Sequence, residues 1–198
     1  LDLSSDEVIT VPFKILELGT GTGIVGLVLD RIIRKNLFNN LSINNKRVNL
    51  DLTVVLTDYN PTVVNNIKRN LENNSIDTEI ESNVEVYTLD WRFYRNEDGS
   101  TSEHINELSK DANTKFDLIL ACDCIYEMEH SYLVGKVARQ YLKPDGRFWT
   151  IWPLRERWFK ESEVFIKQCL ERYNCITSEE IEDNDHIRMT YKSCVYKL

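Results

Sequence analysis

Apolar residues along this chain alternate between short continuous runs and sets spaced three or four positions apart. A continuous run is typical of a strand buried on both faces, whereas the wider spacing is typical of an amphipathic helix. Leu52–Thr57 is such a continuous run, and six more strands are predicted at Lys14–Leu18, Val84–Leu89, Phe116–Ala121, Arg147–Trp152, Cys175–Ile181 and Arg188–Tyr196. The spaced sets predict four helices, at Ile24–Arg34, from Pro61 onward, at Glu129–Leu142 and at Arg157–Tyr173.

Strands that alternate with helices predict the doubly wound α/β class, a mostly parallel sheet with helices on both faces. No helical pattern separates the last two strands, so we expect them to form an antiparallel hairpin at one edge. Two polar stretches, Asn36–Asn49 and Asn96–Thr114, are predicted to be surface loops, and Lys143–Gly146 is predicted to be a turn. With 198 residues and no long linker, residues 1–198 are predicted to form one domain.

The first predicted strand runs into a glycine-rich turn that opens the first helix. Glycine lets a backbone approach a ligand closely, and the helix directs its first N–H groups into the turn. Spacing alone also matches a dinucleotide fingerprint, and a purely structural turn is a further alternative. Glu17 favours a cationic ligand, because its carboxylate would repel a pyrophosphate. We therefore predict S-adenosylmethionine as the cofactor, bound by Glu17, Gly19, Thr20, Gly21, Thr22 and Gly23.

Polar or aromatic residues follow the next three predicted strands, at the sheet edge where α/β proteins bind ligands. Asp58 is placed to accept hydrogen bonds from the ribose hydroxyls, although a turn aspartate would look the same. Asp90 is placed to accept from the adenine amino group and Trp91 to stack on the ring; a core tryptophan beside a solvated aspartate is the alternative. Asp123 and Tyr126 are placed to orient an incoming amine, or they are a turn aspartate and a half-buried tyrosine.

The charge and composition of the chain limit the classes of partner that we expect it to bind. The net charge of −8 and the pI of about 5.0 disfavour nucleic acid and suit a basic protein surface. No apolar run approaches the ~20 residues of a membrane span, so no membrane partner is expected. The five cysteines are odd in number and lack C-x-x-C spacing, which argues for free thiols and against a disulfide framework or a metal site.

From about Phe13 to Leu198 the chain resembles the eukaryotic seven-β-strand (class I) protein-lysine methyltransferases, which use S-adenosylmethionine. The glycine motif is common to all class I enzymes, whereas the pair Asp90-Trp91 and the motif Asp123-x-x-Tyr126 narrow the resemblance to lysine methylation. The matching segments are Leu16–Gly26, Thr57–Asp58, Leu89–Trp91, Phe116–Tyr126, Leu142–Gly146 and Pro153–Arg157.

The resemblance implies a sheet of order 3-2-1-4-5-7-6 with the last strand antiparallel. It implies that Asp123 and Tyr126 support activity and that Ala121 belongs to the cofactor site. It also implies a specific protein substrate that presents a lysine, such as a translation elongation factor or a chaperone, in the cytoplasm and also in the nucleus. The family's N-terminal helical segment is missing before the first strand, so we expect an incomplete chain. The oligomeric state, the substrate and the number of methyl groups stay open.

The mechanism expected from these residues is an in-line attack of a neutral lysine amine on the sulfonium methyl group. Tyr126 is expected to position the amine, and Asp123 to hold the ammonium on arrival. Two other functions stay open at this point. One is a class I methyltransferase acting on a histidine, an N-terminus or a small metabolite, and the other is a scaffold that kept the fold without catalysis.

Overall fold

The computed structural model describes residues 8–34, 42–43, 46–75, 83–95, 106–110, 114–183 and 189–198. The strands are β1 (Val8–Leu18), β2 (Ser42–Ile43), β3 (Lys46–Asp58), β4 (Val84–Thr88), β5 (Phe116–Cys122), β6 (Leu142–Pro153), β7 (Asn174–Asp183) and β8 (Met189–Lys197). The α-helices are α1 (Ile24–Ile32), α2 (Pro61–Ser75), α3 (Met128–Tyr141) and α4 (Phe159–Arg172). Short 3₁₀ turns are η2 (Trp91–Tyr94), η3 (Glu107–Lys110) and η4 (Glu156–Trp158).

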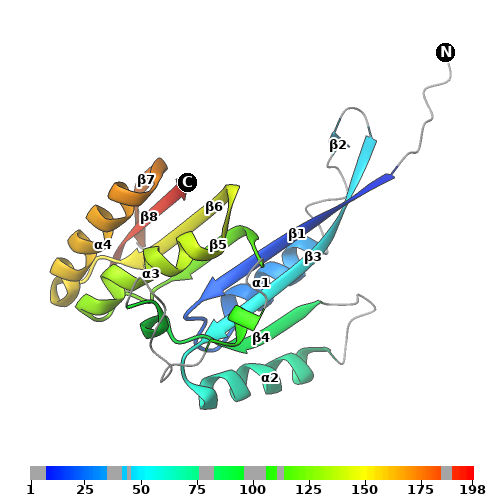
Figure 1. Cartoon of the computed structure of the whole chain (residues 1–198), viewed down its shortest axis with the longest axis horizontal. Helices are drawn as coiled ribbons and strands as arrows, with labels where there is room; N and C mark the ends of the chain where they lie inside the picture. Colours follow the sequence, from blue (N-terminus) through cyan, green and yellow to red (C-terminus); the bar gives the residue numbers. More distant parts are fainter. Residues whose placement is uncertain are drawn as a thin grey trace.

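All described strands belong to one sheet, in the order β4-β3-β1-β5-β6-β8-β7 (Figure 1). The first five strands of this row are parallel, and β8 runs antiparallel between β6 and β7. The two-residue strand β2 adds an antiparallel pair at the start of β3. The predicted order 3-2-1-4-5-7-6 is therefore confirmed, as is the terminal hairpin. This is the doubly wound α/β arrangement predicted from the sequence.

The sheet has an apolar core on each face. Neighbouring residues of β1 point to opposite sides, so Ile15 belongs to one core and Leu16 to the other. The core around Ile15 includes Ile67 of α2 and residues packed from α1, whereas the core around Leu16 includes Phe165 of α4 and residues of α3. Figure 1 shows α3 and α4 together on one face of the sheet and α1 behind it. This two-sided burial explains the continuous apolar runs in the sequence.

The predicted loop Asn36–Asn49 is wrong for the residues of this stretch that the structure describes. Residues 42–43 form β2, and β3 begins at Lys46, where Arg47 pairs with Val8 of β1. Polar and apolar residues alternate here, so Val48 is buried while Arg47 and Asn49 are exposed. Strand pairing uses backbone groups and tolerates polar side chains on the solvent side. Residues 36–41 and 44–45 lie outside the described residues.

The predicted loop Asn96–Thr114 is also wrong in part. Asn106 forms a β-bridge with Leu89, and Leu108 is buried in the core beside α3. The side-chain amide of Asn106 donates to the Tyr94 hydroxyl at 2.6 Å. These contacts fix residues 106–110 against the body of the protein, while residues 96–105 and 111–113 lie outside the described part.

The predicted boundaries around helices are mostly confirmed. Asn60 caps α2, because its side-chain oxygen accepts from the Thr62 N–H at 2.9 Å, and Pro61 is the first helical residue. The predicted turn Lys143–Gly146 lies inside β6 as a bulge, since the pairing moves from Phe116–Leu142 to Leu118–Arg147. None of the described helices is long and apolar enough to cross a membrane.

Candidate functional site

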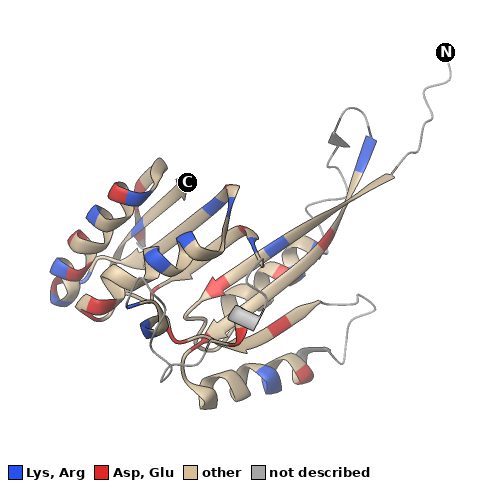
Figure 2. Cartoon of the chain, in the orientation of Figure 1, with Lys and Arg blue, Asp and Glu red and all other residues tan. Residues whose placement is uncertain are grey.

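A cleft of about 660 Å³ opens at the carboxyl ends of the central parallel strands. Its volume lies in the range of small-molecule sites, and its position is the one expected for ligands in an open α/β sheet. Figure 2 shows acidic residues near the tips of these strands. The cleft brings together most of the predicted site residues, namely Glu17, Gly19, Thr20, Gly21, Thr22, Asp58, Asp90, Trp91, Asp123 and Tyr126.

Two predicted cofactor residues, Gly23 and Ala121, do not line the cleft. Gly23 has φ +81° and precedes α1, and a Cβ there would lie 3.1 Å from a methyl carbon of Ile67. Ala121 is buried inside the sheet and pairs with Leu18 and Thr150. Gly23 and Ala121 therefore pack against the protein interior. The sequence motifs contain more residues than those that face the cleft.

Several residues that line the cleft were not predicted from the sequence. His130 of α3 packs edge-on against Trp91, with ring centres 5.4 Å apart, and its Nδ1 accepts from the Tyr126 N–H at 3.4 Å. Other unpredicted lining residues are Ile24, Val25, Tyr59, Arg92, Cys122, Cys124, Glu127, Glu129 and Leu133. They follow the recognised motifs or lie on α3, and no spacing in the sequence singles them out.

Glu17 lies buried at the floor of the cleft. Its Oε2 accepts a hydrogen bond of 2.9 Å from the Gly26 N–H, in the first turn of α1. The carboxylate thus binds the start of the helix that follows the glycine turn. Burial outweighs both the Thr20 hydroxyl contact and this backbone bond, and it raises the pKa of Glu17 from 4.5 to about 7. A buried acid with a pKa near neutrality, facing a cleft, is a feature of functional sites.

Replacing Gly26 with alanine is expected to destabilise the fold. A Cβ at Gly26 would lie 2.2 Å from Leu56 Cδ2 and 2.6 Å from Glu17 Oε2. Overpacking of this kind costs about 1–3 kcal/mol. Urea unfolding measures the loss.

The matched control is Gly135→Ala in α3, where a Cβ would lie at an ordinary 3.5 Å from Cys169 Sγ. That variant should gain up to ~1 kcal/mol from helix propensity. A Gly26→Ala protein as stable as the wild type would contradict the packing described for α1.

Stability should fall as Glu17 ionises. The folded protein binds the Glu17 proton more tightly than the unfolded chain does, so folding is favoured most below pH 4.5 and loses stability up to about pH 7. The shift corresponds to about 3 kcal/mol. The variant Glu17→Gln keeps an acceptor for Gly26 and should lack this component of the pH dependence.

Urea unfolding of both proteins at pH 5 and pH 7.5 isolates the Glu17 component, because other titrating groups contribute equally to each. Equal pH dependence of the two proteins would contradict the raised pKa.

Asp58 lies at the end of β3, and both of its carboxylate oxygens accept hydrogen bonds from backbone N–H groups. Its Oδ2 accepts from the Gly21 N–H at 3.3 Å and its Oδ1 from the Asn60 N–H at 3.0 Å. A carboxylate has about four acceptor positions, so it can also accept from the hydroxyl groups of a ligand. Next to it, the buried Thr20 hydroxyl lies beside the Glu17 carboxylate and helps to lower the pKa of that acid.

Asp90 is bound by a neighbouring arginine that the sequence did not indicate as its partner. Both of its oxygens accept from Arg92, with Nη2 at 2.6 Å from Oδ2 and Nε at 2.9 Å from Oδ1. Its Oδ1 also accepts from the Arg92 N–H and so caps η2. Trp91 lies against the glycine turn, because its ring carbons would be 3.1 Å from a Cβ at Gly19. The aspartate is therefore buried and ion-paired, which argues against the alternative of a solvated aspartate beside a core tryptophan.

Asp123 and Tyr126 lie beside the cleft in the segment between β5 and α3. Asp123 has φ +45° and forms a bidentate ion pair with Arg155, with both N–O distances 2.8 Å. Tyr126 is 41% exposed and packs edge-on against Trp158 at 5.4 Å. Partial burial, then the nearby Asp123, raises the pKa of the Tyr126 phenol, so it stays neutral at physiological pH. Both Asp123 oxygens are thus engaged by Arg155, and the role of Asp123 in holding an ammonium group stays a prediction.

The cysteines of the cleft are inert thiols. Burial raises the pKa of Cys122 to about 12, and it also raises that of Cys124, which is buried. All five cysteines of the chain are free. Because the thiolate is the reactive form, these residues serve packing and not nucleophilic catalysis.

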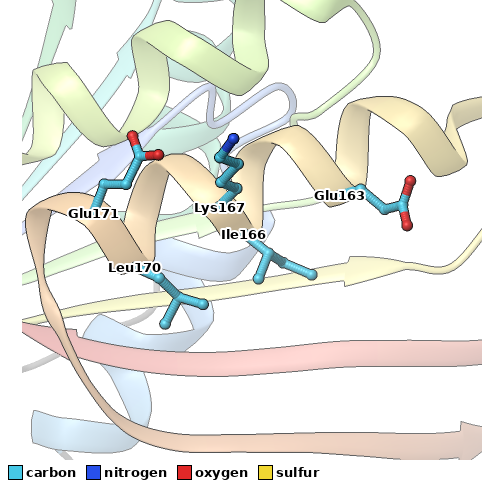
Figure 3. Close-up of a pocket in the computed structure, with 5 residues that line it drawn as sticks. All are labelled: Glu163, Ile166, Lys167, Leu170 and Glu171. Atoms are coloured by element: carbon cyan, nitrogen blue, oxygen red, sulfur yellow. The ribbon is translucent and has the colours of Figure 1, made fainter.

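A second hollow, of about 520 Å³, lies along α4 (Figure 3). It is lined only by residues of that helix, namely Glu163, Ile166, Lys167, Leu170 and Glu171. None of these residues lines the cleft at the strand ends, and they bring no set of groups that suits catalysis.

Comparisons with known proteins agree with this geometry. A family model described as lysine methyltransferase matches residues 5–172. Protein-lysine N-methyltransferase rrg1 of Schizosaccharomyces pombe is 33% identical over 153 residues, which cover 77% of this chain and 42% of that protein. Protein-lysine N-methyltransferase EFM2 of Saccharomyces cerevisiae is 27% identical over 190 residues, covering 92% of this chain and 39% of that protein. The chain thus spans about two fifths of the length of these relatives.

Among solved structures, Aeropyrum pernix fibrillarin in complex with natively bound S-adenosyl-L-methionine is similar, with a TM-score of 0.56. Its sequence identity is 13%, and the match covers 98% of this chain and 68% of that chain. At this identity the likeness concerns the fold.

Proposed function

This chain belongs to the lysine methyltransferase family, and from that membership we propose that it transfers a methyl group from S-adenosylmethionine to a lysine side chain of a specific protein. One observation carries the proposal beyond the family. Four strand ends bring a buried acid, a glycine turn, a second carboxylate and an indole into one cleft, with Asp123 and Tyr126 at its side.

The residues of the cleft fit this cofactor. Glu17 and the glycine turn suit a cationic amino-acid end, and the Thr20 hydroxyl lines the same part of the cleft. Asp58 retains acceptor positions for ribose hydroxyls, and Trp91 offers a ring face or edge for adenine. When bound, S-adenosylmethionine supplies an electrophilic methyl group on its sulfonium. Asp90 is engaged by Arg92, so we assign adenine recognition mainly to Trp91.

The chain's own residues then have to present a neutral amine. A free lysine has a pKa near ~10.4, so removing its proton at pH 7 costs about 4–5 kcal/mol. The rings of Tyr126 and Trp158 can shield the aliphatic stem from water and disfavour the ammonium form. The neutral Tyr126 hydroxyl can accept or donate a hydrogen bond and so orient the amine for in-line attack. Water receives the released proton.

The proposed substrate is a protein, and a translation elongation factor is the class that the family resemblance favours. One relative carries the name calmodulin-lysine N-methyltransferase, which places its activity on a protein lysine. The net charge of −8 also favours a basic protein surface over nucleic acid. A cytoplasmic location, and a nuclear one, follow from this substrate class and are testable by fluorescence imaging of the tagged protein.

The proposed activity is tested with methyl-labelled S-adenosylmethionine and a eukaryotic cytosolic extract. We expect label in one or a few proteins, and mass spectrometry should place it on a lysine. An extract whose lysines are blocked by prior acetylation is the control and should stay unlabelled, because an amide nitrogen is not a nucleophile. Label on a histidine or an N-terminus would instead support another methyltransferase activity. Cofactor binding by calorimetry without any labelling would favour a scaffold.

A further inference from the structure

Arg155 connects the Asp123-x-x-Tyr126 motif to a segment 30 residues further along the chain. Its guanidinium donates from Nη1 to Asp123 Oδ1 and from Nη2 to Asp123 Oδ2, each at 2.8 Å. A bidentate pair of this kind is charge-assisted and fixes the orientation of both side chains. Asp123 lines the cleft, whereas Arg155 is not among the lining residues. Arg155 therefore acts on the cleft through Asp123, and its guanidinium also interacts with the Tyr126 hydroxyl.

Other contacts hold both partners in place. Asp123 adopts the left-handed conformation that aspartate tolerates, and its N–H donates to the Ile151 carbonyl at 2.8 Å. The guanidinium carbon of Arg155 lies 5.2 Å from the centre of the Trp158 ring, and Trp158 packs on Tyr126. The ion pair is thus anchored to the end of β6 and to the aromatic pair beside the cleft.

The pairing has a consequence for an incoming lysine. A free carboxylate within about 4–6 Å stabilises the ammonium form and raises the pKa of the amine. Such a carboxylate would work against methyl transfer, because only the neutral amine is a nucleophile. Asp123 bound on both oxygens by a guanidinium presents little net charge to the cleft.

On the basis of the proposed function, we propose that Arg155 is a positioning residue that neutralises Asp123, so that the target lysine reaches the cleft without a carboxylate that would keep it protonated. This differs from the expectation that Asp123 itself holds the ammonium. Arg155 acts through Asp123 and needs no contact with the substrate.

Other charged or titratable groups share the surroundings of Asp123. Those from the strand ends and the turns that follow them are Glu17, Asp58, Tyr59, Asp90 and Arg92. Those from the segment after β5 and from α3 are Cys122, Cys124, Tyr126, Glu127, Glu129 and His130. The segment after β6 adds Arg155 and Arg157, which lies 5.2 Å from the Trp158 ring. Apart from the residues that each variant replaces, these groups are common to all the variants below, so a difference in pH profile between Arg155→Gln and Arg157→Gln reports the Asp123–Arg155 pair.

The test compares the pH dependence of methyl transfer in Arg155→Gln, Arg157→Gln and the wild type. Arg157 is the matched control, because its guanidinium also lies 5.2 Å from Trp158 but has no bond to Asp123 among the described contacts. The probes are labelled S-adenosylmethionine and the extract protein that the wild type labels, from pH 6.5 to 9.5. We expect the midpoint of the Arg155→Gln profile to rise by about one pH unit, with a roughly tenfold lower rate at pH 7. We expect a rise of only about one pH unit because the Asp123–Arg155 pair is partly exposed and water screens its charges.

The double variant Asp123→Asn/Arg155→Gln removes both charges and should return the midpoint to that of the wild type. A profile lowered equally at every pH in Arg155→Gln, with an unmoved midpoint, would overturn the proposal.

If Arg155→Gln does not fold, as judged by thermal unfolding, Arg155→Lys replaces it. Lysine keeps the charge without the planar fork, so the rate should fall while the midpoint stays; a shifted midpoint would overturn the proposal. A wild type that binds S-adenosylmethionine but labels no lysine refutes the proposed function. It also refutes the role of Arg155, because that role depends on lysine methylation. A wild type that labels lysine while the Arg155→Gln midpoint stays refutes the role of Arg155 alone.

Discussion

Replacing Gly21 with valine is expected to abolish S-adenosylmethionine binding while the protein stays folded. Gly21 lines the cleft with φ +56°, and a Cβ there would meet no heavy atom within 4 Å. The valine side chain would therefore enter open space at the cleft and not the core. Crowding of a bound ligand costs about 1–3 kcal/mol per clash, so we expect more than a ~100-fold loss of affinity.

Calorimetric titration with S-adenosylmethionine measures this loss. The matched control is Gly21→Ala, which carries the same left-handed strain of about 1–2 kcal/mol with fewer added atoms. Thermal unfolding of both variants reports the strain, and the difference in affinity reports the filled space. A valine variant that binds as tightly as the wild type would place the cofactor elsewhere.

Removing the Tyr126 hydroxyl is expected to lower kcat by about 100-fold, in the range seen for a positioned polar group at a reacting centre. Tyr126→Phe keeps the ring and its edge-on packing against Trp158, so the fold and the cofactor affinity should be unchanged. What it loses is the hydroxyl beside Asp123 that can orient the amine.

Tyr132→Phe is the control, because Tyr132 is a 46% exposed tyrosine of α3 that is not among the residues lining the cleft. Turnover is measured on the protein that the wild type labels, and cofactor affinity by calorimetry. Near-normal turnover of Tyr126→Phe would remove Tyr126 from the reaction. A parallel loss of cofactor affinity would reassign it to cofactor binding.

The Asp123 half of the motif calls for a milder substitution than alanine. Asp123 has φ +45°, which asparagine tolerates better than alanine, and it is paired with Arg155. Asp123→Ala would mix backbone strain, a stranded guanidinium and any catalytic loss in one measurement. Asp123→Asn is therefore expected to lower methyl transfer without loss of cofactor binding, and its unfolding curve separates stability from activity.

Much of the fold follows from local sequence patterns. The apolar runs of β3 and β5 are nearly continuous because both faces of the central sheet are buried, and this burial can be inferred from each run alone. Asn60-Pro61 predicted the start of α2 because capping is a contact between neighbouring residues. The wrong loop predictions concern Lys46–Asn49 and Asn106–Lys110, where polar segments are held by distant partners.

In the candidate site too, some features follow from local sequence patterns and others depend on distant partners. Glu17, Gly21, Asp58 and Trp91 follow strands in the sequence, so the rule that strand ends share one edge of the sheet was enough to bring them together. By itself, the sequence determined the sheet, its order by family resemblance, and the identity of most cleft residues. Only the tertiary structure decided that Arg155 neutralises Asp123, that Arg92 occupies Asp90, and that burial gives Glu17 a pKa of about 7. The reason is physical: strand ends are set by local pattern, whereas charge state and pairing depend on side chains that the chain brings close only when it folds.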